Sequence, residues 1–293
     1  FVGMLLGGLT ISYPALQPGI NLWANPTGAG FPIFPLMFVT IACGACSGFH
    51  GIVSSGTTSK QLQRETDALP VGYGGMLLEG IVALIALTTI MTLAVGSQTL
   101  AQSPDEIYAQ GIARFMSIFG IPFGLAVTFG KLAFATFIYD TLDVATRLGR
   151  YIFQELTGWK DRLGAYLATF ATVAIPIAII FWKVESVGGK TIPLWKIFWP
   201  VFGASNQLVA ALSLLGITIW LRKNGKKSWM TGLPALFMIL ITVWSLIILA
   251  SPLVMRTISG TWSADPVGWA AIVLLVIGIS VIWEGRRGFV RAN

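Results

Sequence analysis

Long apolar blocks separated by short polar stretches dominate the sequence. After a first apolar run that ends near Ile11, seven blocks are each long enough to cross a bilayer as a helix, which takes about 18 residues or more. These blocks are residues 33–56, 73–96, 112–142, 164–182, 197–221, 232–251 and 267–283. Apolar and polar residues do not alternate as in a barrel, and open sheet edges cannot face lipid. The pattern therefore predicts an all-α, polytopic transmembrane helical bundle.

Composition and charge placement support this interpretation. Only 11% of the residues are charged and 55% are hydrophobic, whereas soluble domains carry about 25% charged residues. The net charge is +7, which in a soluble protein would suggest nucleic acid. Here the loops on one side carry 13 of the 19 lysines and arginines, and those on the other side carry five. The positive-inside rule then places the basic side and the C-terminus in the cytoplasm, and no nucleic-acid partner is expected.

The start of the chain suggests a larger protein. The sequence opens at Phe1 within an apolar run that is too short to cross a bilayer. We interpret residues 1–11 as the end of a truncated transmembrane helix and residues 12–32 as an extracytoplasmic loop. Residues 33–221 form the predicted transmembrane core. Residues 222–293 form two trailing helices and a cytoplasmic C-terminus.

The first complete block contains small and polar residues at membrane depth. Gly44, Ser47, Gly48 and the only histidine, His50, lie within it. Glycines weaken a helix, and broken helices hold ions and small solutes in transporters. The alternative is a small-residue packing face, because Gly44 and Gly48 have GxxxG spacing.

Two motifs in the same block suggest other chemistry. Cys43 and Cys46 resemble a redox or metal pair, and Gly44-x-Cys46-x-Gly48 resembles a nucleophile elbow. An elbow needs a preceding strand, and zinc needs about four ligands, of which only His50 is near. No enzyme activity, metal or cofactor is therefore expected.

Ionisable residues in the next two blocks are candidates for ion coupling. Glu79 and Lys131 lie at membrane depth, where charge is costly and usually functional. Glu79 could instead form a structural hydrogen bond, and Lys131 could pair with a carboxylate of the absent half or extend to the interface. Asp140 and Asp143 stand at the expected end of their span. Asp143 is spaced to pair with Arg147, so these residues could gate the inner mouth or anchor the helix end.

Adjacent amides occur in the block at residues 197–221. Asn206 and Gln207 each carry donors and acceptors that need partners at membrane depth. They could bind a substrate or a neighbouring helix, and the sequence does not choose between these roles.

Several stretches of sequence, in order, carry a resemblance to a known family. They are Phe38–Ala45, Ser47–His50, Ser55–Thr58, Glu65–Asp67 with Gly72–Gly74, Asp140–Asp143 with Thr146–Arg150, and Phe202–Leu208. Together they closely resemble the carbon-starvation protein A (CstA) family, from about Phe31 to Leu221. Cys46 stands where that family usually has an aliphatic residue, which argues against a redox role.

The resemblance implies a fold and a function. Members are described as transporters of peptides, or of pyruvate with protons, that act when carbon is limiting. The family is grouped with the amino acid–polyamine–organocation transporters, whose LeuT-like fold contains an inverted repeat. Residues 33–221 would then be the second repeat, and their interrupted first span would match the broken sixth helix, which also runs from outside to inside. The absent half would carry the family's Gly- and Pro-rich motif with paired histidines.

The main hypothesis is a secondary active transporter of the prokaryotic inner membrane that works by alternating access. The substrate carboxylate would bind Gly44, Ser47, Gly48 and His50, with Asn206 and Gln207 nearby. Glu79 is the first candidate for proton coupling, and Lys131 could replace a bound sodium ion.

Other functions fit the same sequence. A channel or facilitator, a non-transporting membrane subunit, a membrane enzyme and a receptor are the alternatives. The sequence predicts neither the oligomeric state nor the choice between peptide and pyruvate.

Overall fold

The computed structural model describes residues 2–3, 33–44, 46–94, 97–185, 191–260 and 265–290. Within them, seven helical segments are long and apolar enough to cross a membrane, one for each predicted block. These segments are Phe34–Lys60, Glu65–Met91, Phe123–Thr157, Arg162–Phe181, Leu194–Lys223, Trp229–Ile258 and Pro266–Gly285. The prediction of a polytopic helical membrane protein is confirmed. The expected loop at residues 12–32 and most of the expected first helix lie outside the described residues.

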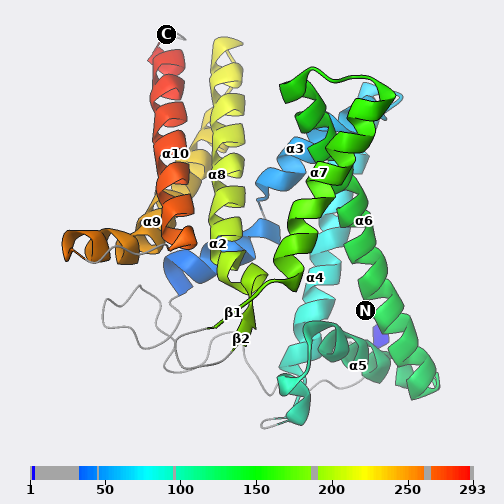
Figure 1. Ribbon diagram of the computed structural model, residues 1–293. Helices are drawn as coiled ribbons and strands as arrows, with labels where there is room; N and C mark the ends of the chain where they lie inside the picture. Colours follow the sequence, from blue (N-terminus) through cyan, green and yellow to red (C-terminus); the bar gives the residue numbers. More distant parts are fainter. Residues whose placement is uncertain are drawn as a thin grey trace. The chain divides into compact units, whose positions relative to one another are not determined.

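The chain forms two compact units (Figure 1). Among the described residues, the first contains residues 2–3, 57–94 and 97–172, and the second contains residues 33–44, 46–56, 173–185, 191–260 and 265–290. The break in the first span therefore belongs to the second unit, whereas Glu79 and Lys131 belong to the first.

The first unit is built on three helices that pack through glycines. They are α4 (Gly75–Met91), α5 (Pro104–Ser117) and α6 (Phe123–Thr157), with short helical turns at Thr58–Lys60, Glu65–Asp67, Pro70–Gly74 and Gln98–Ala101. A Cβ on Gly111 of α5 would lie 2.3 Å from the Cβ of Thr89 on α4. A Cβ on Gly130 of α6 would lie 2.8 Å from the Cα of Ala109 on α5. Only glycine allows these helices to approach so closely.

The expected span at residues 112–142 is two elements in the structure. Helix α5 has proline and two acidic residues in its first turn and ends before Gly120, which has φ +75°. Helix α6 begins directly after Pro122. The Gly120–Pro122 stretch therefore separates two helices and does not interrupt one.

Helix α6 also extends further than expected. It runs to Thr157 and ends at Gly158, whose left-handed backbone (φ +74°) terminates helices efficiently. Asp140 and Asp143 therefore lie inside a continuous helix, and their predicted position at a helix end is wrong. The hydropathy pattern marks where apolar residues stop, but a helix continues as long as its backbone hydrogen bonds do.

The second unit begins with the interrupted span and ends with a bundle of three long helices. The span consists of a π-helical turn (Ile33–Met37), α2 (Phe38–Ile41), a 3-10 turn (Ala42–Gly44) and α3 (Gly48–Gly56). The bundle consists of α8 (Leu194–Lys223), α9 (Trp229–Ile258) and α10 (Pro266–Val290). Its apolar core contains Ala204, Leu208, Leu246, Ala250 and Ala271.

A short hairpin precedes the bundle and was not predicted. Helix α7 (Arg162–Phe181), whose residues fall partly in each unit, is followed by β1 (Lys183–Glu185) and β2 (Thr191–Pro193). The two strands pair antiparallel, with Val184 opposite Ile192. The Gly188-Gly189 pair between β-branched residues was the available sequence signal.

Candidate functional site

The first span is interrupted between Gly44 and Gly48, a feature that we call the break. The 3-10 turn ends at Gly44 and α3 begins at Gly48. Ser47 caps α3, because its Oγ accepts the backbone N–H of His50 at 3.4 Å. The glycines and the capping serine are the local reasons why the helix stops and restarts here.

Asn206 of α8 holds both sides of the break. Its Oδ1 accepts the backbone N–H of Phe49, in the first turn of α3, at 2.7 Å. Its Nδ2 lies 3.0 Å from the Sγ of Cys43 and 3.3 Å from the Oγ of Ser47. Asn206 is only 6% exposed. One buried amide therefore satisfies an N–H at the start of α3 and also binds the turn before it.

The two glycines of the break have different surroundings. A Cβ on Gly48 would lie 2.3 Å from the backbone O of Asn206 and 2.6 Å from the Cβ of Val209. A Cβ on Gly44 would meet nothing within 4 Å. Gly48 is therefore required for packing against α8, as the alternative interpretation proposed, and Gly44 faces an open side.

The predicted substrate-binding residues other than Gln207 fall into two groups. Ser47, Gly48 and Asn206 meet where α3 packs on α8, whereas Gly44 and His50 are exposed. The N–H groups of Phe49 and His50 already donate within the chain. The backbone around Gly44 and the imidazole of His50 are thus the groups of the break best placed to meet a solute. Their role in substrate binding stays a prediction.

Gln207 is not part of the break. It is completely buried, and neither its Nε2 nor its Oε1 has a hydrogen-bond partner among the described residues. Successive residues of a helix are about 100° apart around its axis, so Gln207 and Asn206 face different neighbours.

Glu79 lies beside an apolar pocket of the first unit. The pocket has a volume of about 420 Å³ and is lined by Glu79 of α4, Tyr108 of α5, and Phe134 and Phe137 of α6, among others. Tyr108 and Phe134 are in ring contact, with centroids 5.7 Å apart. Glu79 is the carboxyl group of a pocket otherwise made of apolar and aromatic side chains, and its role in ion coupling stays a prediction.

Lys131 has a partner that was not predicted. Its Nζ lies 2.6 Å from the Oε2 of Glu106, in the first turn of α5. The expected partner in the absent half is therefore not needed to explain this lysine. The signal for Glu106 was the Ser103-Pro104-Asp105-Glu106 stretch, a typical helix start with acidic residues in its first turn.

The same contacts set the charge of α5. Hydrogen bonds from Lys131 and from Gln110, the latter 3.0 Å long, lower the pKa of Glu106. A hydrogen bond from Ser103 lowers the pKa of Asp105. Both carboxylates are therefore ionised at neutral pH. A lysine already neutralised by Glu106 is a weaker substitute for a sodium ion than a lone one.

The remaining candidates form no further cluster. Asp143 pairs with Arg147 at 3.0 Å, as its spacing predicts, but the carboxylate is 66% exposed, and such exposed pairs contribute little. Cys43 and Cys46 are both free thiols. In the described part of the chain, no three His, Cys, Asp or Glu residues are grouped so that they could hold a metal ion.

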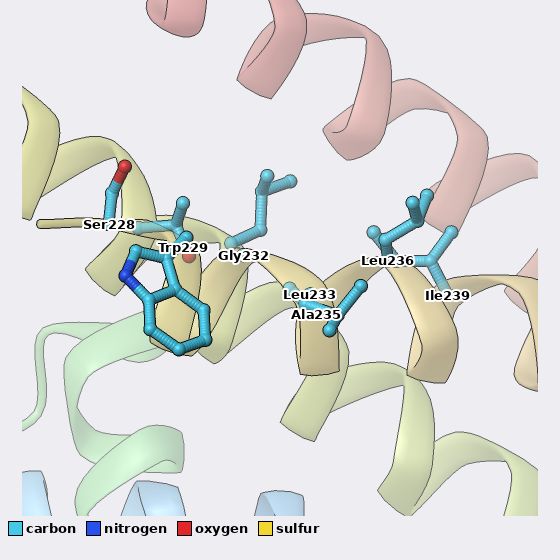
Figure 2. A pocket seen from close by; sticks show the side chains of 9 residues that line it. Ser228, Trp229, Gly232, Leu233, Ala235, Leu236 and Ile239 are labelled. Atoms are coloured by element: carbon cyan, nitrogen blue, oxygen red, sulfur yellow. The ribbon is translucent and has the colours of Figure 1, made fainter.

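A second pocket lies between α8 and the start of α9 (Figure 2). It has a volume of about 470 Å³, and most of its lining side chains, such as Trp229 and Leu236, come from α9. It contains none of the predicted site residues, and its lining is almost entirely apolar.

Comparison with known proteins identifies the family. The model of the family described as carbon starvation protein CstA matches residues 1–105 and 92–245. A peptide transporter CstA of Helicobacter pylori is 32% identical over 311 residues, which cover 86% of this chain and 45% of the relative. The pyruvate/proton symporter BtsT of Escherichia coli is 29% identical over 324 residues, which cover 84% of this chain and 45% of that protein.

Relatives from other bacteria match a similar share of this chain, but only part of each relative is covered. A peptide transporter CstA of Mycobacterium tuberculosis is 30% identical over 327 residues, which cover 86% of this chain and 42% of the relative. The chain thus spans a little under half the length of the curated relatives it matches. No solved structure matches at a significant level. The match of the family model to most of the chain, together with these identities, shows that the chain belongs to the carbon starvation protein CstA family.

Proposed function

We propose that the full-length protein is a secondary active transporter that takes up small organic nutrients, peptides or pyruvate, together with protons. The observation that carries this proposal is the break in the first span, held open by Asn206 of α8. Transporters place such discontinuous helices at substrate and ion sites. The printed names of the relatives, which include a peptide transporter and a pyruvate/proton symporter, support the same class.

The substrate would bind on the exposed side of the break. Gly44 leaves space for a ligand to approach the backbone, and the His50 imidazole supplies a hydrogen bond or charge for a carboxylate. We propose a LeuT-like arrangement in which residues 33–221 form the second inverted repeat and residues 222–293 form two trailing helices. Alternating access would then move this repeat against the half that this chain does not contain.

Proton coupling is assigned first to Glu79. It is the carboxyl group that lines the apolar pocket of the first unit, and ionisable side chains at membrane depth usually serve a function. Asp140 and Asp143 remain secondary candidates, and Lys131 is weakened by its pairing with Glu106. In the full-length protein, Glu79→Gln should remove the dependence of uptake on external pH. Glu155→Gln, at an exposed position of α6, is the control and should keep that dependence.

The membrane is proposed to be the bacterial inner membrane, with the C-terminus in the cytoplasm. The support is the uneven distribution of lysine and arginine between alternate loops.

The proposal is tested by counterflow in liposomes that contain the full-length protein, with pyruvate and with di- and tripeptides. His50→Ala and Gly44→Val should raise the KM for the transported substrate. Gly216→Val, where a Cβ also meets nothing within 4 Å, should leave the KM unchanged. If both break variants keep the wild-type KM, the break is not the substrate site. Transport without accumulation against a gradient would indicate a facilitator.

A further inference from the structure

Four buried polar atoms in the second unit have no hydrogen-bond partner among the described residues. They are Nε2 and Oε1 of Gln207 on α8, and the hydroxyl oxygens of Thr242 and Ser245 on α9. All three residues are 0% exposed. A buried polar group without a partner is costly, so unpaired groups that gather in one place point to a bound ligand.

The helix register places the three residues together. The hydroxyl of Thr218 on α8 bonds that of Thr231 on α9 at 2.9 Å, which fixes the antiparallel alignment of the two helices. Gln207 lies 11 residues before Thr218, and Thr242 lies 11 residues after Thr231. Since both segments rise equally per residue, Gln207 lies opposite Thr242. Ser245 is one turn further along the same face of α9.

The core cluster confirms this register. Ala204 of α8 and Leu246 of α9 belong to one buried cluster, as expected if Gln207 is level with Thr242. Long side chains in helices lean toward the N-terminus of their own helix. The amide of Gln207 is therefore directed from the level of Thr242 toward the level of Ser245.

The two hydroxyls differ from their neighbours on the same helix. Ser251 bonds the carbonyl of Ile248 at 2.9 Å, and Thr257 bonds that of Leu253 at 2.8 Å. Such bonds to the preceding turn are how most helical hydroxyls in an apolar environment are satisfied. Thr242 and Ser245 make no such bond, so their hydroxyls need a partner elsewhere.

The chemistry of the cluster selects a neutral ligand. The sequence places no charged residue on α8 between Lys196 and Arg222, and none on α9 before Arg256. A cation buried here would have no counter-charge, and the Nε2 of Gln207 would repel it. A small molecule that both donates and accepts fits all four atoms. Water does so, and buried water typically makes about three hydrogen bonds to such groups.

We propose that Gln207, Thr242 and Ser245 form an internal water site between α8 and α9. The water accepts from the Nε2 of Gln207 or from a hydroxyl, and donates to the Oε1 of Gln207 or to the other hydroxyl. This hydration site stabilises the pairing of α8 with α9.

The sign of a stability change tests the proposal. In the full-length protein in nanodiscs, Thr242→Val and Ser245→Ala keep the shape of each side chain but remove a hydroxyl. If water is bound, each change removes one of its partners, and the Tm falls. If the groups are dry, each change removes an unsatisfied buried group, and the Tm rises. Thr218→Val is the control and lowers the Tm in either case, because its hydroxyl already bonds Thr231 of α9 as well as the Leu214 carbonyl.

Direct observation complements the variants, in case one of them fails to fold. A high-resolution density map of the wild-type protein should show a peak within about 2.5–3.2 Å of polar atoms of at least two of the three side chains. A map in which Gln207 bonds Thr242 or Ser245 directly, with no peak between them, would overturn the proposal. A second result would also overturn it. If the Tm is higher in sodium chloride than in choline chloride, and Thr242→Val removes this difference, the ligand is a cation and not water.

Discussion

Replacing Asn206 should release the break from α8. In Asn206→Leu, the side chain keeps most of its volume, but it can neither accept the N–H of Phe49 nor donate to Cys43 and Ser47. The conformation of the break then depends on the Ser47 cap and on apolar packing alone.

The magnitude follows from the lost hydrogen bonds. The contact to Phe49 is 2.7 Å long and joins a largely buried amide to the first turn of α3. Leaving one such group without a partner costs about 1–3 kcal/mol. Since about 1.4 kcal/mol corresponds to a factor of ten, the population of molecules with a detached break should rise roughly 5- to 140-fold.

Cys43 provides the assay. Its half-buried thiol is free and lies 3.0 Å from the Nδ2 of Asn206, so it becomes accessible when the break detaches. In a Cys46→Ser background of the full-length protein, Asn206→Leu should increase the rate of maleimide labelling of Cys43 roughly 5- to 140-fold. Ser205→Ala is the matched control, because its hydroxyl donates to the Phe202 carbonyl of its own helix. Wild-type labelling and wild-type uptake in Asn206→Leu would refute the reasoning.

Three further predictions concern packing, charge and orientation. Gly130→Ala should lower the free energy of unfolding by about 1–3 kcal/mol, because the new methyl group meets Ala109. Gly124→Ala, at an open position of the same helix, should raise it by about 0.5–1 kcal/mol. Thermal unfolding of both variants tests this prediction. The pKa of Glu106 is lowered in the folded state, so the ionised carboxylate of Glu106 stabilises the fold. This contribution is complete above the ordinary glutamate pKa of about 4.3 and is lost as the pH falls through the lowered pKa. Unfolding measured between pH 3 and 7 should show that Glu106→Gln removes this component, and Lys131→Met, which removes the main cause of the lowered pKa, should reduce it. Finally, a fluorescent protein fused to the C-terminus should fluoresce, and a periplasmic phosphatase fused there should be inactive, because the C-terminus is expected in the cytoplasm. The reverse result would show that the topology is inverted.

The membrane spans were predictable because each depends on a single local property, the length of an apolar block. Helix α5 shows where this property fails. Its residues are amphipathic, with Asp105 and Glu106 in the first turn, so no apolar block marks it, and its second half was merged with the span that follows. The partner of Lys131 was missed for the same reason, because Glu106 lies on that unrecognised helix.

The adjacent amides show the limit of prediction at the site itself. The sequence indicated that Asn206 and Gln207 both need partners at membrane depth, either in a substrate or in a neighbouring helix. Helix geometry directs the two side chains to different surroundings, because neighbouring residues point about 100° apart. Asn206 accepts from Phe49, which is 157 residues away in the sequence, and the register directs Gln207 to α9. No local pattern encodes either choice, since each depends on how distant helices pack. A substrate should therefore be sought first beside Gly44 and His50, where the break is exposed, because Asn206 already bonds both sides of the break and Gln207 is completely buried.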